Sequence, residues 1–565
     1  MKELESDKLE KKIYDFLPHE PETMIMTLFV IVMAAYYFWR LFAITPQYDE
    51  LYTYYTFISR GALYSAIHWP LPNNHVGYSV LSALLDHLGN PYIGLRGISY
   101  ICAVANLYLV YKICKRYYSH ALSIGAMFLY ASMQVVNEYS VQGRGYTLAT
   151  TCFLVMIYAA GSICSIEDTK RSTYIMMAIA LILGLYTVPS SIYWVLPVCL
   201  AIAIYLIVNA IRSTDQSEKL SDSAYFKKFK RYFKTGIIAA LLTTVLYMLI
   251  WLAIGSNLLV KDPESRFFGL SHVTLLVRSP VSALTAGIKY MLSQPYIQSL
   301  PRDVFWEDYP GYILRLFNYM LPGLSYIITF ALIIGFFIAV IECVRHFAYS
   351  RTVINIIFST SVVVTFVLLM IQHKQPYLRV FSYFSFIVVL AFCNAFEALI
   401  NVSVRLYNKG IMKKKAIEYS PGHKETEQTI KDGKWYLGNG VYIPALAMVI
   451  VFIIRFAGTD FNMQLGSREN DVFNTMYIAG VEKRQNPAVL DCDQQYLMKF
   501  GWDIDCQKTD VDDSDCVIID KNMMTPGYAG PDFWKFYQTY ETIKWDYIKT
   551  MRAVYENDSF ILYIK

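Results

Sequence analysis

Residues 24–44 read MIMTLFVIVMAAYYFWRLFAI, and Arg40 is the only charged residue among them. A helix needs about 20 mostly apolar residues to cross a membrane, so this stretch predicts a spanning helix. A helix also pairs its backbone polar groups internally, as a single segment in lipid must. Because the run is long and follows a charged stretch of mixed sign, we expect it to persist as an anchor rather than to be cleaved as a signal peptide.

The rest of the chain repeats this pattern. Hydrophobic residues make up 55% of it and charged residues only 17%, whereas soluble domains average about 25% charged residues. About eleven spans are predicted in all, and the ten further runs lie at 95–112, 119–136, 146–165, 174–189, 191–210, 236–256, 319–343, 353–372, 378–400 and 441–457. The fold class expected is therefore an all-α polytopic membrane protein.

Basic residues set the predicted orientation. They gather in alternate loops, for example at 227–231 and 413–415, and such loops face the cytoplasm. The N-terminus is then cytoplasmic and, with eleven spans, the C-terminus is outside. Two long outer loops, 45–94 and 257–318, are expected to contain helices that lie in the membrane interface.

The composition changes after the last apolar run. Residues 458–565 are polar and contain short β-like runs at 516–520 and 560–564. They predict a small extracytoplasmic α/β domain that follows a transmembrane catalytic domain of residues 1–457. Cys492, Cys506 and Cys516 lie in this region, so one disulfide is possible there. The net charge of +5 is small for this length and argues against a nucleic-acid partner.

The adjacent acids Asp49 and Glu50 directly follow the first span. Neighbouring residues of a helix point in different directions, so one acid can face a cavity while the other binds a partner. A carboxylate held there is suited to accept a proton from an attacking hydroxyl. The alternative is a pair of solvated acids at the start of a helix, where negative charge is favourable.

Three further groups of polar residues occupy the predicted outer loops. Asn74 and His75 are suited to bind sugar hydroxyls, or else form a turn before a helix. Glu138, Arg144 and Tyr146 surround glycines, and an arginine there can hold a phosphate with two donors or simply pair with Glu138. His373, Lys374 and Arg379 form a cationic group that would stabilise a departing phosphate, or anchor the chain at the interface.

These motifs resemble the GT-C superfamily of membrane glycosyltransferases, and within it the branch of protein O-mannosyltransferases and bacterial aminoarabinose transferases, glycosyltransferase family 39. The resemblance rests on short motifs and their order along the first ten spans. They are Asp49-Glu50, Asn73-Asn74-His75, Arg144-Gly145-Tyr146, and Pro376 with Arg379 and Tyr383. The sequence departs from the family at Gln142, where relatives often have an acid, and Glu138 one turn earlier is a possible substitute.

The resemblance implies an inverting, single-displacement transfer of a sugar from a polyprenyl-phosphate donor to a hydroxyl of a glycan, lipid or protein. Asp49 would be the general base, and Glu50 would orient the acceptor or help to bind a cation such as Mg²⁺ or Mn²⁺. Arg144 and Arg379 would hold the donor phosphate, and His75 would line the pocket. The Lys, Ile and Tyr usage favours a bacterial plasma membrane and an undecaprenyl carrier.

A membrane transporter or flippase of lipid-linked substrates is the rival prediction. Transporters carry their charged residues near the bilayer midplane, on broken helices that often belong to inverted repeats. In this sequence the unexpected charges fall in outer loops, and no repeat is visible. The sequence therefore favours the glycosyltransferase.

Overall fold

Eleven apolar helices form the body of the protein. The computed structural model describes residues 20–69, 73–165, 167–214, 219–260, 270–293, 297–345, 347, 351–407, 442–458, 461, 467–532 and 534–565; the basic stretch 413–415 lies outside these ranges. The eleven helices are α2 (Pro21–Ala43), α6 (Pro91–Tyr117), α7 (His120–Ala131), α9 (Tyr146–Ile163), α10 (Arg171–Thr187), α11 (Ile192–Arg212), α12 (Ala224–Val260), α16 (Ser325–Arg345), α17 (Arg351–Gln372), α18 (Phe384–Tyr407) and α20 (Tyr442–Ala457). Each coincides with one predicted span, so the all-α polytopic fold is confirmed.

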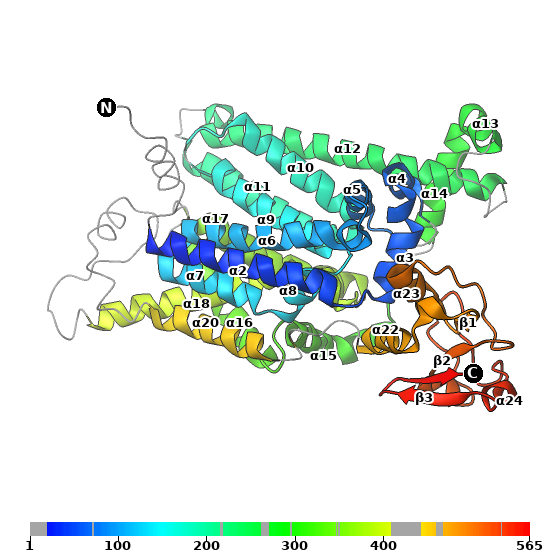
Figure 1. Cartoon of the computed structure of the whole chain (residues 1–565). Helices are drawn as coiled ribbons and strands as arrows, with labels where there is room; N and C mark the ends of the chain where they lie inside the picture. The colour runs from blue at the N-terminus through cyan, green and yellow to red at the C-terminus, as the bar shows by residue number, and fades with distance from the viewer. Residues whose placement is uncertain are drawn as a thin grey trace, which may run out of the picture.

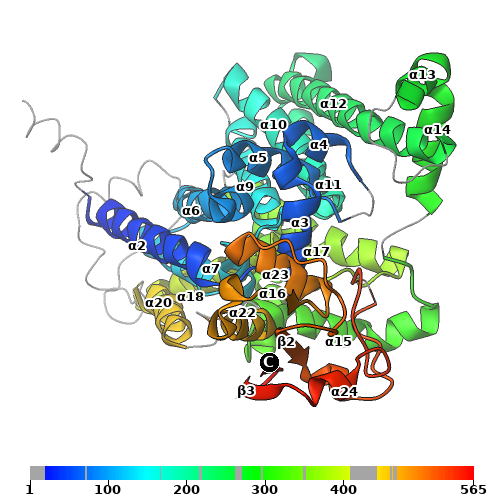
Figure 2. The same ribbon diagram turned by 45° about the vertical axis from the view of Figure 1, so that its right-hand side comes forward.

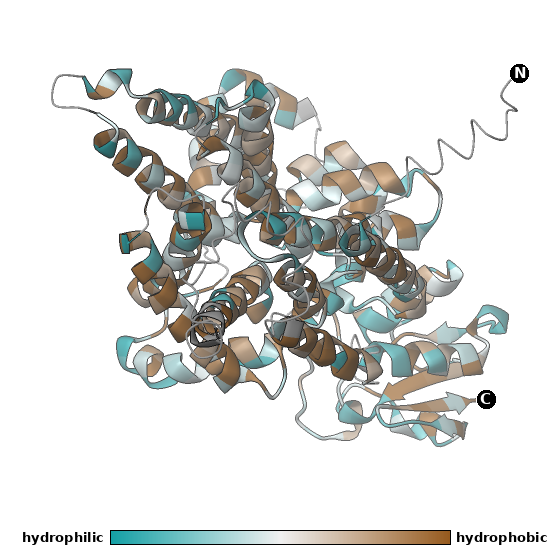
Figure 3. Cartoon of the chain, turned by 90° about the vertical axis from the view of Figure 1, so that its left-hand side faces the viewer, coloured by the Kyte–Doolittle hydropathy of each residue, from teal (hydrophilic) through white to brown (hydrophobic). Residues whose placement is uncertain are grey.

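Seven of these helices are long and apolar enough to cross a membrane by length and composition. They are α2, α6, α9, α11, α12, α16 and α17, and in the described residues the other four contribute shorter apolar stretches at 120–131, 171–187, 384–400 and 443–457. Apolar residues run along all the long helices (Figure 3). Many of the large ones are exposed, as Leu28, Leu241 and Phe330 are at 61–65%. Lipid is the medium that can cover such continuous apolar surfaces.

Local sequence signals set several helix ends. Pro21 and Pro91 open α2 and α6, where the missing N–H has no intrahelical partner to lose. Asn90 caps α6 by accepting hydrogen bonds from the backbone N–H of Tyr92 and Ile93. The predicted span 319–343 begins later than expected, at Ser325. Helix α15 ends at Met320, and Gly323, at φ 79°, lies in the turn that follows it.

The short elements between these helices lie at one end of the body (Figure 1). In the first predicted outer loop they are α3 (Tyr48–Thr56), η1 (Ile58–Arg60), α4 (Ala62–Ile67) and α5 (Val76–Asp86). Further along the chain they are α8 (Gln134–Tyr139), η2 (Pro189–Ser191), α13 (Leu270–Arg278), α14 (Pro280–Ser293), α15 (Arg302–Met320) and η4 (Leu378–Phe381); η3 (Leu220–Asp222) precedes α12. Residues 70–72, 261–269 and 294–296 of the two long loops are not described.

Helix α5 is half-buried against the body, whereas α14 is buried only where it packs on α12. Half of α5 is buried, including Val76, Tyr78 and Ala83. Helix α14 crosses α12 at two glycines: a Cβ added at Gly255 would lie 1.6 Å from the Ala283 carbonyl oxygen, and one added at Gly287 would lie 2.0 Å from that of Trp251. Small residues permit this backbone approach.

The C-terminal region folds into a small mixed sheet with helices beside it. The elements are α22 (Ser467–Ala479), η6 (Val481–Lys483), β1 (Pro487–Ala488), α23 (Cys492–Trp502), β2 (Cys516–Asp520), η7 (Lys521–Met524), α24 (Trp545–Ile548), β3 (Arg552–Glu556) and β4 (Phe560–Ile564). The strand order is β1-β2-β4-β3, with β1 parallel to β2 and the other pairs antiparallel. This confirms the predicted α/β region, whose exact boundary at residue 458 stays a prediction. Cys492, Cys506 and Cys516 are buried free thiols rather than a disulfide.

The C-terminal region packs against the helical body. Val472 and Met476 of α22 belong to the same hydrophobic core as the long helices. Helix α23 lies beside α3 (Figure 2). The C-terminal region therefore shares one end of the molecule with α3, α5 and α14 (Figure 1). Within it, Arg468 joins three segments through hydrogen bonds to buried aspartates: Asp491 (3.1 Å), Asp493 (2.8 Å) and Asp520 (2.9 Å).

Candidate functional site

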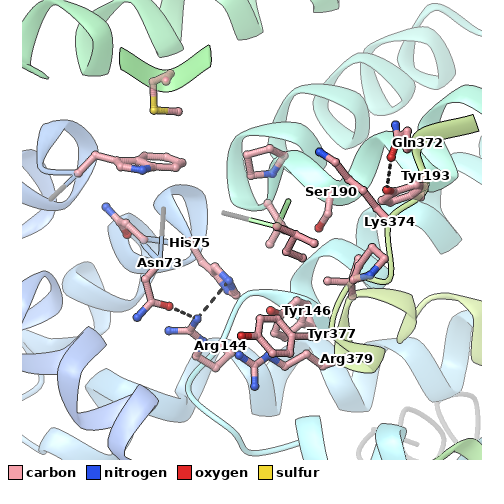
Figure 4. Close-up of a pocket in the computed structure, with 18 of the residues that line it drawn as sticks. Asn73, His75, Arg144, Tyr146, Ser190, Tyr193, Gln372, Lys374, Tyr377 and Arg379 are labelled. Carbon is pink, nitrogen blue, oxygen red and sulfur yellow. Dashed lines mark hydrogen bonds between the residues drawn. The ribbon is translucent and has the colours of Figure 1, made fainter. Parts of the chain in front are cut away.

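A cavity of about 430 Å³ opens among the short elements at this end of the molecule. Segments far apart in the sequence form its wall: the start of α5, the start of α9, η2, α14, and the connection between α17 and α18. Its predicted site residues are Asn74, His75, Arg144, Tyr146, Lys374 and Arg379. Several of them point into one space (Figure 4). The fold thus brings together residues from three separate predicted loops.

Arg144 is held at the inner wall of the cavity and is only 3% exposed. One guanidinium nitrogen, Nη1, donates to Thr53 Oγ1 (2.7 Å) and to the Asp49 carbonyl oxygen (3.3 Å). The other, Nη2, donates to Asn73 Oδ1 and lies 3.4 Å from His75 Nε2. Its Nε has no hydrogen-bond partner among the described residues. The guanidinium is therefore fixed in place without a carboxylate to neutralise it.

Arg379 lies on η4 and forms an ion pair with Asp49, with 3.3 Å between Nη2 and Oδ2. Both side chains keep about a quarter of their surface exposed, 27% and 26%. Burial disfavours the guanidinium, but Tyr146, Tyr139 and Asp49 outweigh this and raise the pKa of Arg379. Asp49 does not line the cavity. It lies at its border, linked to it through Arg379.

The charge of the cavity wall is strongly one-sided. Arg144, Arg379 and Lys374 line it, and no aspartate or glutamate does so among the described residues. Lys374 forms no ion pair with a carboxylate in the part of the chain that the structure describes, and its side chain extends toward Ser190 (Figure 4). An interfacial anchor, the alternative for Lys374, would point outward. Such a cavity favours an anionic ligand.

His75 is a neutral hydrogen-bonding group at this wall. The backbone N–H of Gly145 donates to its Nδ1 at 2.8 Å, so the neutral ring carries its proton on Nε2. Burial, with Arg144 and Arg379 nearby, lowers the pKa of His75 well below 6.5. Both Nε2–H and the Arg144 guanidinium are then donors, 3.4 Å apart. An anionic oxygen is able to accept from both.

The lowered pKa of His75 predicts a dependence of stability on pH. Below pH 6.5 the unfolded chain binds a proton that folded His75 does not, so the free energy of unfolding falls as the pH falls. The slope is up to about 1.4 kcal/mol per pH unit until folded His75 itself titrates. Thermal unfolding in detergent from pH 7.5 to 4.5 measures it. We expect a shallower slope in His75→Asn, which keeps an acceptor for Gly145, and no change in His87→Asn, which is exposed. Equal slopes for all three proteins would contradict the assignment.

Glu50 has a different place from the one predicted. It is fully buried and accepts two hydrogen bonds from Arg96, Nε to Oε1 at 2.8 Å and Nη2 to Oε2 at 2.9 Å. The backbone N–H groups of Gln47 and Gly143 donate to the same carboxylate at 3.0 and 2.6 Å. With both oxygens occupied, Glu50 is not available to orient an acceptor. Glu50 therefore has a structural role. It links α3 to Arg96 of α6 and to the backbone of Gly143, next to Arg144.

Three more predicted site residues are engaged in structural contacts, two of them outside the cavity. Glu138 is partly buried outside the cavity and accepts a hydrogen bond from Tyr319 at 2.6 Å, so it does not replace the missing acid near Arg144. His373 packs on Phe305, with ring centroids 5.2 Å apart. Asn74 lines the cavity, but its amide is engaged with Ser65, His68 and Ser79, which ties α4 to α5.

The predicted cation near Asp49 and Glu50 does not fit the donors present. Glu50 is occupied by Arg96 and two backbone N–H groups, and Asp49 pairs with Arg379. Among the described residues, no three metal-ligating side chains lie close enough to hold an ion. Mg²⁺ and Mn²⁺ require several oxygen ligands, so we derive no step through a metal.

Several residues of the cavity were not predicted from the sequence. Trp69, Tyr193 and Gln372 line it, and Tyr193 donates a hydrogen bond to Gln372 Oε1 at 2.7 Å. Arg96, the partner of Glu50, was also missed. Arg96 lies inside the predicted span 95–112, and a charged residue within a span usually has a partner. This position alone could have indicated that Arg96 pairs with an acid.

Comparisons with known proteins complete the description. No protein-family model matches this sequence, and no curated protein matches it. Among solved structures, the chain is similar to the aminoarabinose transferase ArnT from Cupriavidus metallidurans bound to undecaprenyl phosphate, with TM-score 0.49 and 11% identity over 95% of this chain and 97% of that one. It is also similar to the oligosaccharyltransferase AglB from Archaeoglobus fulgidus in complex with an inhibitory peptide and a dolichol-phosphate, with TM-score 0.40 and 12% identity over 84% of this chain. The chain spans 63% of that archaeal enzyme, which is less than two thirds.

Proposed function

We propose that this protein is a GT-C-type glycosyltransferase. It moves a sugar from a polyprenyl-phosphate carrier to a hydroxyl acceptor on the extracytoplasmic side of a membrane. The observation that carries this proposal is a cavity with three cationic side chains and no carboxylate in its described lining, bordered by one carboxylate, Asp49. This chemistry requires cationic groups that bind a phosphate and a carboxylate that acts as general base.

The charges suit the leaving group better than the donor. Arg144, Arg379 and Lys374 contribute three positive charges and Asp49 one negative charge, which leaves an excess of two. A glycosyl phosphodiester carries one negative charge, whereas the released phosphate monoester carries about 1.5 to 2 at pH 7. Because interactions that strengthen toward the transition state accelerate a reaction, this excess favours cleavage of the sugar–phosphate bond.

The proposed reaction is a single displacement. The acceptor hydroxyl gives its proton to Asp49 while its oxygen attacks the anomeric carbon. The bond from that carbon to the phosphate oxygen breaks, and the electron pair stays on the oxygen beside Arg144 and Arg379. One displacement inverts the anomeric configuration. His75 contributes an N–H donor without adding charge.

The surroundings of the cavity suit an isoprenoid carrier. Trp69, Met291 and Ile297 line the cavity. Trp69 belongs to a separate apolar cluster with Ile250 and Ile254 of α12, against which Met291 packs, and α12 is a largely exposed helix long enough to span a membrane. An apolar wall therefore leads from the cationic groups toward lipid.

Binding of the carrier tests the phosphate site separately from catalysis. We expect Arg144→Gln to weaken binding of undecaprenyl monophosphate to protein in nanodiscs by roughly tenfold or more, since charge-assisted hydrogen bonds contribute about 1.5–3 kcal/mol. Arg144→Lys should not restore it, because lysine does not provide the two-pronged geometry. Arg315→Ala, which removes an exposed ion pair with Asp308, is the matched control. If Arg144→Gln bound undecaprenyl monophosphate as tightly as wild type, the phosphate would not bind at this wall of the cavity.

Cleavage separates the transferase from the rival flippase. Wild-type protein should release labelled sugar from undecaprenyl-phosphate hexose, whereas a flippase would move the intact lipid between leaflets. Intact donor that crosses the bilayer without cleavage would favour the flippase.

A further inference from the structure

Helix α3 carries the candidate base, and two of its sides are already occupied. An α-helix turns by about 100° per residue, so Glu50 and Thr53 lie about 60° apart around α3 and can meet different neighbours. Glu50 points into the core toward Arg96. Thr53 points toward the cavity, where its hydroxyl accepts a hydrogen bond from Arg144.

A third side of α3 faces the C-terminal region. Tyr48 and Tyr55, two turns apart, both pack on Tyr496 of α23, with ring centroids 5.9 and 5.5 Å apart. The side that remains lies between the cavity and the C-terminal region. It is formed by the partly exposed residues Asp49, Tyr52 and Thr56.

Aromatic rings continue from this open side of α3 onto the C-terminal region. The Tyr52 ring lies 6.3 Å from that of Tyr48, which in turn lies 5.3 Å from Trp534. Tyr52, Tyr496 and Trp534 are partly exposed. The Arg468 guanidinium lies over the Trp534 ring at 4.7 Å, and three aspartates fix that guanidinium. The rings are thus held in place before any ligand arrives.

We propose that these rings, Tyr52, Tyr496 and Trp534, form the acceptor subsite and that the acceptor is a saccharide. This inference rests on the proposed function. With the donor in the cavity, the open side of α3 is the route by which a hydroxyl reaches Asp49 without displacing Arg144 or Arg379.

The chemistry of the surface favours a sugar over a peptide or a lipid. A pyranose has a flat face of C–H groups that stacks on an aromatic ring, while its hydroxyls bond to polar groups at the ring edges. Tyrosine and tryptophan combine an apolar face with a polar edge. A peptide would be better served by an exposed strand edge. The edge strand β3 pairs with β4 at the end of the sheet order opposite β1, whereas the element of the C-terminal region that packs on α3 is the helix α23. A lipid would require a continuous apolar groove.

The test combines ligand binding with turnover. Saturation-transfer NMR would detect manno- and gluco-hexasaccharides on protein in nanodiscs loaded with undecaprenyl monophosphate. Transfer from labelled undecaprenyl-phosphate hexose would be measured with the same hexasaccharides and with Ser/Thr-containing peptides as acceptors. The variants are Tyr52→Ala, Tyr496→Ala and the ring-preserving Tyr496→Phe. Tyr540→Ala, which alters an exposed tyrosine whose ring lies 5.3 Å from that of Trp545, is the control.

We expect a hexasaccharide to bind and to accept the sugar. Loss of one stacking ring should raise its KM about two- to tenfold, the range of aromatic stacking energies. Tyr496→Phe, which keeps the ring, should have the KM of wild type, and the control Tyr540→Ala should match wild type both in KM and in hydrolysis of the donor by water. Transfer to peptides but not to saccharides, or an unaltered KM in both alanine variants, would overturn the inference. If wild type failed to cleave the donor at all, the proposed function itself would fail instead.

Discussion

Replacing Asp49 by Asn is expected to stop sugar transfer while leaving the protein folded and able to bind its carrier. General bases contribute about 10²–10⁴ to rates, so kcat should fall by roughly that factor. An amide keeps the size of the carboxylate but does not take a proton. Asp49 is partly exposed at the border of the cavity, so its replacement leaves no unpaired group in the core.

Release of labelled sugar from undecaprenyl-phosphate hexose in nanodiscs measures this effect. Asp308→Asn is the matched control, because Asp308 also pairs with an arginine but is 42% exposed and far along the chain on α15. Equal turnover in wild type and Asp49→Asn would remove Asp49 from the role of base. Another polar group of the cavity wall would then have to act as the base.

Replacing the neighbouring Glu50 by Gln should lower the stability of the fold, which Asp49→Asn leaves unchanged. Removal of one partner from a buried ion pair typically costs about 3–5 kcal/mol, because the other charge stays buried and uncompensated. The amide keeps one acceptor oxygen but replaces the other with an NH₂ donor, so Arg96 would lose its counter-charge and part of its hydrogen bonding, and would keep its hydrogen bonds to the carbonyl oxygens of Leu41 and Ile44. We expect a clear fall in thermal stability in detergent and in the yield of folded protein, whereas Asp49→Asn behaves as wild type in both measurements.

A double variant separates a structural role of Glu50 from a chemical one. Glu50→Met with Arg96→Met removes both charges, so it should be more stable than Arg96→Met alone. It should also regain part of the activity, since the carboxylate is not required for the reaction. A stable Glu50→Gln protein without activity would show instead that Glu50 acts in the chemistry.

Much of the fold could be predicted from the sequence because apolar runs determine it locally. Lipid requires each span to satisfy its own backbone, so each of the eleven runs became a helix whatever its neighbours. The ends were less certain. The start of α16 at Ser325 depends on the turn around Gly323, and the hydropathy pattern continues across that turn.

The candidate site was predictable only in part. Arg144 and Arg379 stood out because positive residues are rare in outer loops, and both line the cavity. The difference between Asp49 and Glu50 was not visible, because it depends on Arg96, 46 residues further along. Trp69 and Tyr193 line the cavity because helices distant in the sequence pack together, and the local sequence around each residue does not predict this packing.

The close packing of α12 and α14 has a consequence for engineering the cavity. Helix α14 supplies Tyr290 and Met291 to the cavity wall, yet its distance from α12 is fixed by Gly255 and Gly287, which lie outside the cavity lining. A larger residue at either glycine would push α14 outward and move that wall with it. The width of the cavity, and with it the size of sugar that the proposed transferase would admit, is therefore open to redesign from positions outside the cavity lining.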